Sequence, residues 1–377
     1  MKFGLHYLLS CSESQSPVER YRDTLEQAVR AEGLGFESVW PVEQHFNQVQ
    51  SALPCPTLLL AAVASRTTTL RLGTAIVQLP LAHPLRTAEE IATLDVLSGG
   101  RVELGVGRGS HPGQFAGFGV PVSESRDRMV EALDYLRVAF TRDRFSFDGR
   151  FFHADDVCLV PKPVQKPHPP VRMAANSPDS FALAGRLGHP ILVATHVNPL
   201  PKLRELLGTY HAARSAAGHP PATPDDLTVL TPFYVGPTAA RVRQDAEPGV
   251  ERFVRVASSS LTASAGSWAT PAEGARMNAL LERLNATTFD TVNTDMGIFD
   301  TPDGCVERLG RIERELGAGR VICWFNFFGA VPHQRVLDSM ELFSAEVLPC
   351  FPDAARPRGP GRPVAVSAAG PDARRSR

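Results

Sequence analysis

The chain lacks the features that define several classes of protein. Its 377 residues contain no apolar run of about 18 residues, the length that a membrane-spanning helix needs. The first residues do not show the pattern of a signal peptide. The formal net charge is only −1, so no excess of positive charge favours nucleic acid. We therefore expect a protein with neither a membrane nor a nucleic-acid partner.

Cysteine is scarce, and its positions exclude two further kinds of site. None of the six cysteines belongs to a Cys-x-x-Cys pair, which argues against a zinc knot or a dithiol redox centre. Scattered cysteines fit a reduced, cytoplasmic protein best. No metal site is expected. The cysteines are Cys11, Cys55, Cys158, Cys305, Cys323 and Cys350.

The chain alternates short apolar runs with longer amphipathic segments. A composition of 43% hydrophobic and 21% charged residues is globular, and the length suits one α/β barrel with insertions. Strands are expected at 2–7, 36–42, 70–77, from 101, 171–175, 191–195, 227–235 and 320–325. Helices are expected at 18–32, 57–65, 85–97, 124–140, 179–187, 200–216, 305–316 and 336–348. These eight units predict a (β/α)8 TIM barrel over residues 1–352.

Three segments interrupt this alternation. Residues 144–168 predict a hairpin, which a proline-rich stretch at 161–170 connects to the fifth strand. An insertion at about 237–300 separates the seventh strand from its helix, and its portion 258–266 is small, polar and predicted to be mobile. Residues 353–377 have no core-forming pattern, so a disordered tail is expected.

The stretch Arg-Val-Glu-Leu-Gly-Val-Gly-Arg-Gly at 101–109 is the first candidate for a site. It begins as a strand and ends in a Gly-Arg-Gly turn. Glycines allow backbone to approach a ligand closely, because they have no Cβ. The guanidinium group of Arg108 suits a phosphate. The alternative is that Arg108 only pairs with a carboxylate.

Several motifs occur together in a familiar order. They are Met-Lys-Phe-Gly at 1–4, Ser-Val-Trp-Pro-Val-Glu-Gln-His-Phe at 38–46, Leu-Gly-Thr-Ala at 72–75, Ala-His-Pro-Leu-Arg at 82–86, Leu-Asp-Val-Leu-Ser-Gly-Gly-Arg at 94–101 and Gly-Val-Gly-Arg-Gly at 105–109. With the proline-rich connection, they resemble the bacterial luciferase-like flavin monooxygenases over roughly residues 1–350. The resemblance implies a TIM barrel that binds reduced FMN at the C-terminal ends of its strands.

The resemblance also implies which residues bind the phosphate of the cofactor. Arg108 corresponds to the phosphate-binding arginine of the family. Asn176, Ser177 and Ser180 follow the fifth strand, where family members bind phosphate through a helix N-terminus, and free N–H groups there attract an anion. The alternative for Ser177 is a plain helix N-cap. The pair Thr74-Ala75 matches the position where family members often have a non-prolyl cis peptide beneath the flavin ring. The alternative is an ordinary strand end with a trans peptide.

The expected catalytic residues follow the second strand. His45 is a plausible acid or base, although a structural histidine is nearly as plausible. Gln44 replaces the first histidine of the luciferase pair and cannot accept a proton as a base. Gly107 replaces the reactive cysteine of luciferase and is expected to leave space beside the ring. These departures put light emission and the aldehyde mechanism in doubt.

Other aromatic and histidine side chains have weaker assignments. His111 and His196 are expected at loops on the substrate side, whereas His83 is expected to be structural. An apolar wall for the substrate, or ordinary core packing, is expected from Trp324, Phe325, Phe327 and Phe328.

The leading hypothesis is a two-component monooxygenase. A separate reductase would supply reduced FMN, and O2 would oxygenate a small organic substrate. The chain is expected to form a homodimer, or a dimer with a related chain, through helices near the second and third strands, with 58–63 in the interface. Alternatives are an F420-dependent oxidoreductase and a non-catalytic flavin-binding partner subunit. A metal-dependent barrel hydrolase is disfavoured, because the first strand offers one histidine, His6, instead of a His-x-His pair.

Overall fold

Eight parallel strands form a closed barrel in the computed structural model, which describes residues 1–11, 15–263, 278, 281–282 and 284–351. Each strand pairs with the next, and the last pairs with the first. In spatial order they are β1 (Lys2–Tyr7), β2 (Ser38–Pro41), β3 (Arg71–Gly73), β5 (Val102–Gly107), β8 (Val171–Ala174), β9 (Ile191–Ala194), β10 (Leu227–Val235) and β12 (Arg320–Trp324). The predicted TIM barrel is confirmed.

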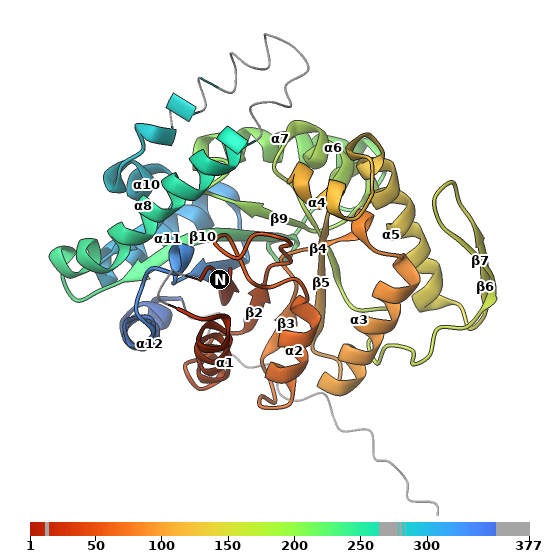
Figure 1. Ribbon diagram of the computed structural model, residues 1–377, viewed down its shortest axis with the longest axis horizontal. Helices are drawn as coiled ribbons and strands as arrows, with labels where there is room; N and C mark the ends of the chain where they lie inside the picture. The colour runs from red at the N-terminus through yellow and green to blue at the C-terminus, as the bar shows by residue number, and fades with distance from the viewer. Residues whose placement is uncertain (12–14, 264–277, 279–280, 283, 352–377) are drawn as a thin grey trace, which may run out of the picture.

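Helices surround these strands (Figure 1). Five of them begin at a proline, which fits the first helical position because its missing N–H would have no partner there. The surrounding helices are α1 (Pro17–Gly33), α2 (Pro56–Ala64), α3 (Pro84–Ser98), α5 (Ser125–Thr141), α6 (Pro178–Leu187), α7 (Leu200–Ala216), α11 (Pro302–Leu316) and α12 (His333–Leu342). None of the helices in the described part of the chain has the length and apolar character to cross a membrane.

The third strand is interrupted, contrary to the prediction of one strand over 70–77. It ends at Gly73 and pairing with β5 resumes at β4 (Val77–Gln78). Gly73 pairs with Glu103 and Val77 with Val106, so one extra residue bulges out on this side. A cis peptide lies within the bulge, between Ala75 and Ile76, one bond later than the predicted Thr74-Ala75 position.

The part of the insertion after β10 that the structure describes is mostly regular. It contains α8 (Ala239–Ala263), α10 (Phe289–Asp295) and a short strand β11 (Ile298–Asp300) that pairs with the end of β10. Of the segment predicted to be mobile, 258–263 are helical, and 264–266 lie outside the described residues. The predicted tail, 353–377, also lies outside them.

Two small elements flank the barrel on the β5 side. The predicted hairpin is confirmed as β6 (Phe145–Asp148) and β7 (His153–Val157), and it projects from the barrel at the right of Figure 1. A short helix, α4 (Pro112–Gly117), follows the Gly-Arg-Gly turn and was not expected. It lies on the side of the barrel where the strands end.

A buried carboxylate closes the opposite, N-terminal end of the barrel. Glu103 accepts hydrogen bonds from Arg71 at 2.6 Å, from Arg172 at 3.0 Å and from Arg320 at 2.8 and 3.0 Å. Burial alone would raise the pKa of the Glu103 carboxyl, but the charges of Arg320, Arg172 and Arg71 lower it well below its usual value. The carboxylate therefore stays ionised and joins three strands.

A tryptophan fills the layer above this cluster. Trp40 is fully buried, donates from Nε1 to the Ser38 hydroxyl at 2.8 Å and lies 5.5 Å from the Arg320 guanidinium. A Cβ at Gly73 would stand 2.1 Å from the Trp40 ring, so only glycine leaves room for it. The lower part of the barrel is thus a packed core, and ligands are restricted to the C-terminal end.

Replacing Glu103 tests this view of the lower barrel. Glu103→Gln leaves the buried guanidinium groups of Arg172 and Arg320, and the partly buried one of Arg71, without their shared charge, so we expect a loss of about 3–5 kcal/mol in the free energy of unfolding. Because the folded-state pKa of Glu103 is depressed, its contribution is present above the ordinary carboxyl pKa and is lost as pH falls through the folded value. The difference in free energy of unfolding between wild type and variant should therefore become smaller in acid. Urea unfolding measures both effects.

Glu89→Gln is the matched control. Its carboxylate pairs with Arg86 on the surface of α3 and is 42% exposed, so we expect a change of less than about 0.5 kcal/mol. Equal stability of the Glu103→Gln variant and wild type near neutral pH would contradict the role of Glu103.

Candidate functional site

The residues predicted to form the site come together at one end of the barrel. They lie in the segments that follow four parallel strands, and the carboxyl ends of such strands share one face, here called the C-terminal face. His45 and Gln44 follow β2, Thr74 and Ala75 follow β3, Arg108 follows β5, and Asn176, Ser177 and Ser180 follow β8.

Arg108 has no acidic partner among the described residues, and its side chain is exposed. This disfavours the alternative in which it only pairs with a carboxylate. Val106 of β5 pairs with Met173 of β8, so the same register places Arg108 beside Ala175. Neighbouring strands lie about 4.8 Å apart. Arg108 is therefore close to the segment that begins α6.

The start of α6 is a complete helix cap. Ser177 is the N-cap, and its hydroxyl lies 3.1 Å from that of Ser180. The Ser180 hydroxyl accepts the backbone N–H groups of Asn176 at 3.0 Å and Ser177 at 2.9 Å. The structural role of Ser177 is thus present. The capped helix end is exposed, carries the partial positive charge of the helix dipole and lies beside Arg108. The two together suit an anion.

The bulge after β3 presents little side-chain chemistry. The Thr74 hydroxyl donates to the Gly105 carbonyl at 2.7 Å and accepts the Gly105 N–H at 2.9 Å. Thr74 is fully buried and Ala75 nearly so. Thr74 therefore fastens the bulge to β5, and any contact of the bulge with a ligand falls to its backbone and to Ile76.

The glycines of the Gly-Arg-Gly turn accommodate protein side chains. A Cβ at Gly107 would stand 2.2 Å from Ile76 Cδ1, and one at Gly109 would stand 2.1 Å from Gln78 Oε1. Gly109 also has a φ of +80°, which favours glycine. The expected open space beside Gly107 is therefore wrong, because the Ile76 side chain occupies it.

The segment after β2 contains an ion pair that the sequence did not reveal. His45 Nε2 lies 2.9 Å from the carboxylate of Glu43, and both side chains are largely buried. The other Glu43 oxygen accepts the Gln78 backbone N–H at 3.1 Å, and Gln78 Nε2 donates to the Glu43 carbonyl at 3.1 Å. Glu43 thus orients the imidazole and anchors it to β4. Gln44 is buried beside it.

Helix α4 covers the same segment. The ring of His45 packs edge-on against Phe118 at 4.8 Å, and Gln50 Nε2 lies 2.9 Å from Nε2 of His111. Phe46 adopts a φ of +60° and packs where Gly117 has no side chain. His111 therefore joins the two loops, and the predicted substrate-side role for it stays a prediction.

A second group of polar side chains lies inside the barrel near the C-terminal face. We call His6, His196 and Trp324 the upper layer. The rings of His6 and His196 meet Trp324 edge to face at centroid distances of 5.3 and 5.7 Å. Burial and the nearby His196 lower the pKa of His6 to about 3, although a backbone hydrogen bond at Trp40 acts in the opposite direction. Burial lowers that of His196 to about 4.

The predicted apolar wall is only partly formed. Phe327 and Phe328 pack against Trp324 at 4.6 and 5.2 Å, as expected. Phe325 instead packs against Phe36 and other rings between the barrel and its helices. It is not part of this wall, because successive side chains of a strand point to opposite faces. His83 caps α3 by accepting the Leu85 N–H at 3.2 Å, in keeping with a structural role.

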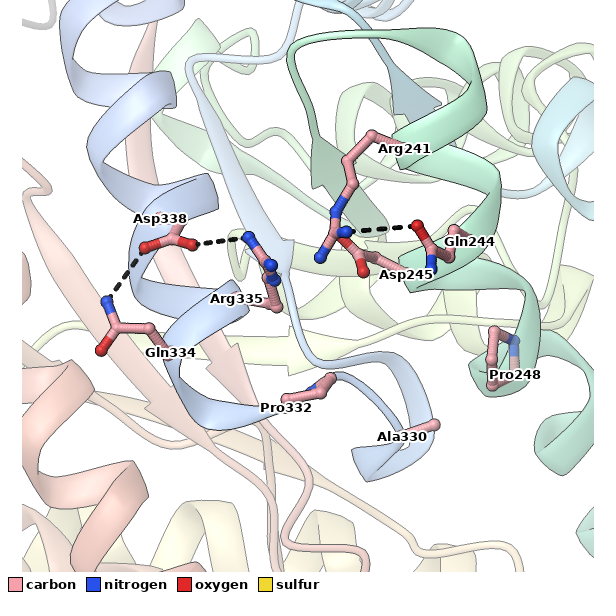
Figure 2. Close-up of a pocket in the computed structure, with 9 residues that line it drawn as sticks. All are labelled: Arg241, Gln244, Asp245, Pro248, Ala330, Pro332, Gln334, Arg335 and Asp338. Atoms are coloured by element: carbon pink, nitrogen blue, oxygen red, sulfur yellow. Dashed lines mark hydrogen bonds and ion pairs between the residues drawn. The ribbon is translucent and has the colours of Figure 1, made fainter.

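A groove outside the barrel is unrelated to these residues. It lies between α8 and α12, has a volume of about 540 Å³, and its arginines are already paired (Figure 2). Arg241 pairs with Asp245 at 2.7 Å and Arg335 with Asp338 at 3.2 Å. In the described part of the chain, His, Cys, Asp and Glu side chains do not gather in threes that could hold a metal.

Comparison with known sequences identifies relatives with two kinds of flavin chemistry. The 4-hydroxyprotoasukamycin monooxygenase of Streptomyces nodosus subsp. asukaensis is 29% identical over 341 residues, 88% of this chain and 86% of that protein. The oxygenase component of the flavin-dependent trigonelline monooxygenase of Acinetobacter baylyi is 27% identical, over 56% of this chain and 59% of its own length. The F420-dependent hydroxymycolic acid dehydrogenase of Mycobacterium tuberculosis is 34% identical, over 52% and 54%. The last two matches span just over half of each relative.

Comparison with solved structures and with a family profile identifies the fold and the family. Monooxygenase RslO1 from Streptomyces bottropensis superposes with a TM-score of 0.78 at 29% identity, over 93% of this chain and 99% of that one. The FMN complex of the oxygenating constituent of 3,6-diketocamphane monooxygenase from Pseudomonas putida gives 0.75 at 21% identity, over 93% and 98%, which supports the fold alone. The profile of the luciferase-like monooxygenases matches residues 1–319. The chain belongs to the luciferase-like monooxygenase family.

Proposed function

We propose that this chain is the oxygenase component of a two-component monooxygenase that takes reduced FMN from a separate reductase. The observation that carries the proposal is the exposed Arg108, which has no acidic partner in the described part of the chain and lies beside the N-terminus of α6 on the C-terminal face. A flavin phosphate fits this pair of features, because the guanidinium supplies charge and the helix end supplies the partial positive charge of its dipole. Relatives named as monooxygenases support the oxygenase reading.

The chain's own residues divide the work of such a reaction. Arg108, Asn176, Ser177 and Ser180 would hold the phosphate, and the backbone of Thr74 and Ala75 would support the ring from the bulge. Reduced FMN, when bound, supplies the electron pair that reduces O2 as one oxygen atom enters the substrate and the other leaves as water. Packing of α4 on the loop after β2 limits the access of water to the ring.

His45 is the group placed to manage a proton. Glu43 bonds to Nε2, which leaves Nδ1 as the ring nitrogen available to hold or release a proton. Gln44 can donate and accept hydrogen bonds but carries no titrating proton, so its role is to orient.

An F420-dependent oxidoreductase is the second candidate. The specific observation in its favour is the 34% identity with an F420-dependent dehydrogenase, which exceeds the identity with the named monooxygenases. The same phosphate site could serve either cofactor.

The first prediction concerns the cofactor phosphate. Arg108→Ala should weaken the binding of reduced FMN by about 1.5–3 kcal/mol, the scale of a hydrogen bond to a charged group. Anaerobic titration measures the dissociation constant. Arg142→Ala, which removes an exposed arginine at the end of α5, is the matched control and should bind as wild type does. Wild-type affinity of a folded Arg108→Ala protein would refute the assignment.

The second prediction concerns proton management. His45→Ala should leave FMN binding nearly unchanged but lower product yield per reduced flavin, because acid–base groups contribute about 10²–10⁴-fold to rate. Glu43→Gln should produce part of this loss by releasing the ring. Gln44→Ala should cause a smaller loss with a weaker pH dependence. Product and hydrogen peroxide are measured together across pH. If His45→Ala keeps wild-type rate and yield, His45 is structural.

The third prediction concerns the homodimer. The predicted interface segment, 58–63, is mostly core, because Leu59, Leu60 and Val63 are buried against the barrel. Leu58 instead is 71% exposed on α2, and Leu97 is 64% exposed on α3, which packs against α2. These two leucines suit an apolar contact with a second chain.

Leu58→Glu should therefore shift the protein from dimer to monomer at micromolar concentration in light scattering. Val18→Glu is the control, because Val18 is 77% exposed on a different helix, α1, and should leave the dimer intact. A wild-type protein that is monomeric at this concentration would contradict the dimer.

A further inference from the structure

The upper layer of the barrel contains polar atoms that the protein itself does not satisfy. His6 Nδ1, His196 Nδ1 and Trp324 Nε1 are buried and have no hydrogen-bond partner among the described residues. Buried donors and acceptors are nearly always paired in folded proteins, because leaving them unpaired costs free energy. Three such atoms on rings that contact one another therefore indicate a place where a ligand completes the hydrogen bonding.

The position of these rings follows from the barrel itself. Leu5 of β1 pairs with Cys323 of β12, so the next residues, His6 and Trp324, are neighbours that point into the barrel. Both side chains are more than nine-tenths buried. His196 lies two residues beyond β9 and also contacts the indole. Strand pairing thus fixes His6 and Trp324, and the turn after β9 adds His196.

The hydrogen-bonding directions of two of the atoms can be assigned. The neutral ring of His6 has one donor and one acceptor nitrogen, and because Nδ1 has no partner, the backbone contact at Trp40 that raises the pKa of His6 fits an N–H on the other nitrogen, Nε2. The remaining nitrogen, Nδ1, is then an acceptor. The indole Nε1 of Trp324 can only donate. A ligand group that satisfies both must donate one hydrogen bond and accept another, which a hydroxyl does.

Aromatic side chains cover one side of the upper layer. Phe327 and Phe328 pack on Trp324, and Phe253 of α8 packs on both at 5.5 and 5.3 Å. Burial holds His6 and His196 in their neutral forms, so an anion would find no compensating charge there. These surroundings favour an apolar, aromatic molecule over a carboxylate or phosphate.

We propose that the upper layer selects a substrate that is apolar and carries a neutral hydroxyl, such as a phenol, with the O–H donating to His6 and its oxygen accepting from Trp324. The proposal rests on the proposed function only in calling this molecule the substrate. The hydrogen-bonding requirement itself depends on the contacts of the upper layer.

Three probes that differ in one group test the proposal in binding experiments. Para-ethylphenol can donate and accept, para-ethylanisole can only accept, and para-ethylbenzoate is an anion. Calorimetric titration of the full-length protein, with and without reduced FMN under anaerobic conditions, should rank the phenol at least about tenfold above the anisole, because the anisole leaves His6 unpaired. The benzoate should bind weakest.

Variants then assign each hydrogen bond. His6→Leu should weaken the phenol to the level of the anisole and leave the anisole unchanged. His6→Gln, which keeps an acceptor, should retain part of the preference. Trp324→Phe keeps a ring but removes the donor, so it should weaken phenol and anisole alike. His153→Leu, the same change as the first at an exposed hairpin residue, should alter neither.

The outcomes separate this proposal from the proposed function. Equal affinity for phenol and anisole, tightest binding of the benzoate, or no binding of any probe to a protein that binds reduced FMN would overturn the proposal. If the His6→Leu variant bound neither the phenol nor the anisole while its melting temperature was unchanged, the proposal would also be overturned. Probe binding as expected by a protein that does not bind reduced FMN would contradict the proposed function and support the assignment of the upper layer.

Discussion

The structure depends on the burial of one carboxylate among three guanidinium groups inside the barrel. Glu103 joins β3, β8 and β12 through Arg71, Arg172 and Arg320. A buried charge needs partners that surround it, because isolated ions are strongly disfavoured in an apolar interior. Strand register must bring these residues together, so the cluster ties barrel closure to a fixed alignment. With Trp40 above it, the N-terminal half of the interior is filled.

The opposite half of the barrel differs in chemical character. The charged groups at the lower end are paired around Glu103, whereas His6, His196 and Trp324 at the upper end present atoms with no partner among the described residues. Around them, Arg108 is exposed and has no acidic partner within the described ranges, and Glu43 orients the ring of His45. A barrel whose lower layers provide stability can leave its upper layers to a ligand, which is the usual division in this fold. The family assignment agrees with a flavin at this face.

Much of the fold could be predicted from sequence. The bounds of α7 and β10 match their predicted ranges, because clear apolar periodicity and flanking prolines define such elements locally. The bulge at 74–76 could not be predicted, since one extra residue is defined only by pairing with β5. The same holds for the contact of Ile76 with Gly107. The placement of Phe325 outside the wall was predictable, because it alternates with Trp324 along one strand. The Glu43–His45 pair required the loop conformation.

The central claim is that the C-terminal face binds reduced FMN and uses it with O2. Anaerobic titration with reduced FMN and, separately, reduced F420, followed by rapid mixing with O2, tests this most directly. The account predicts tight binding of reduced FMN, weak binding of F420, and a transient absorbance on mixing that differs from oxidised FMN and decays faster when substrate is present. Preferential binding of F420 with no reaction towards O2 would contradict it.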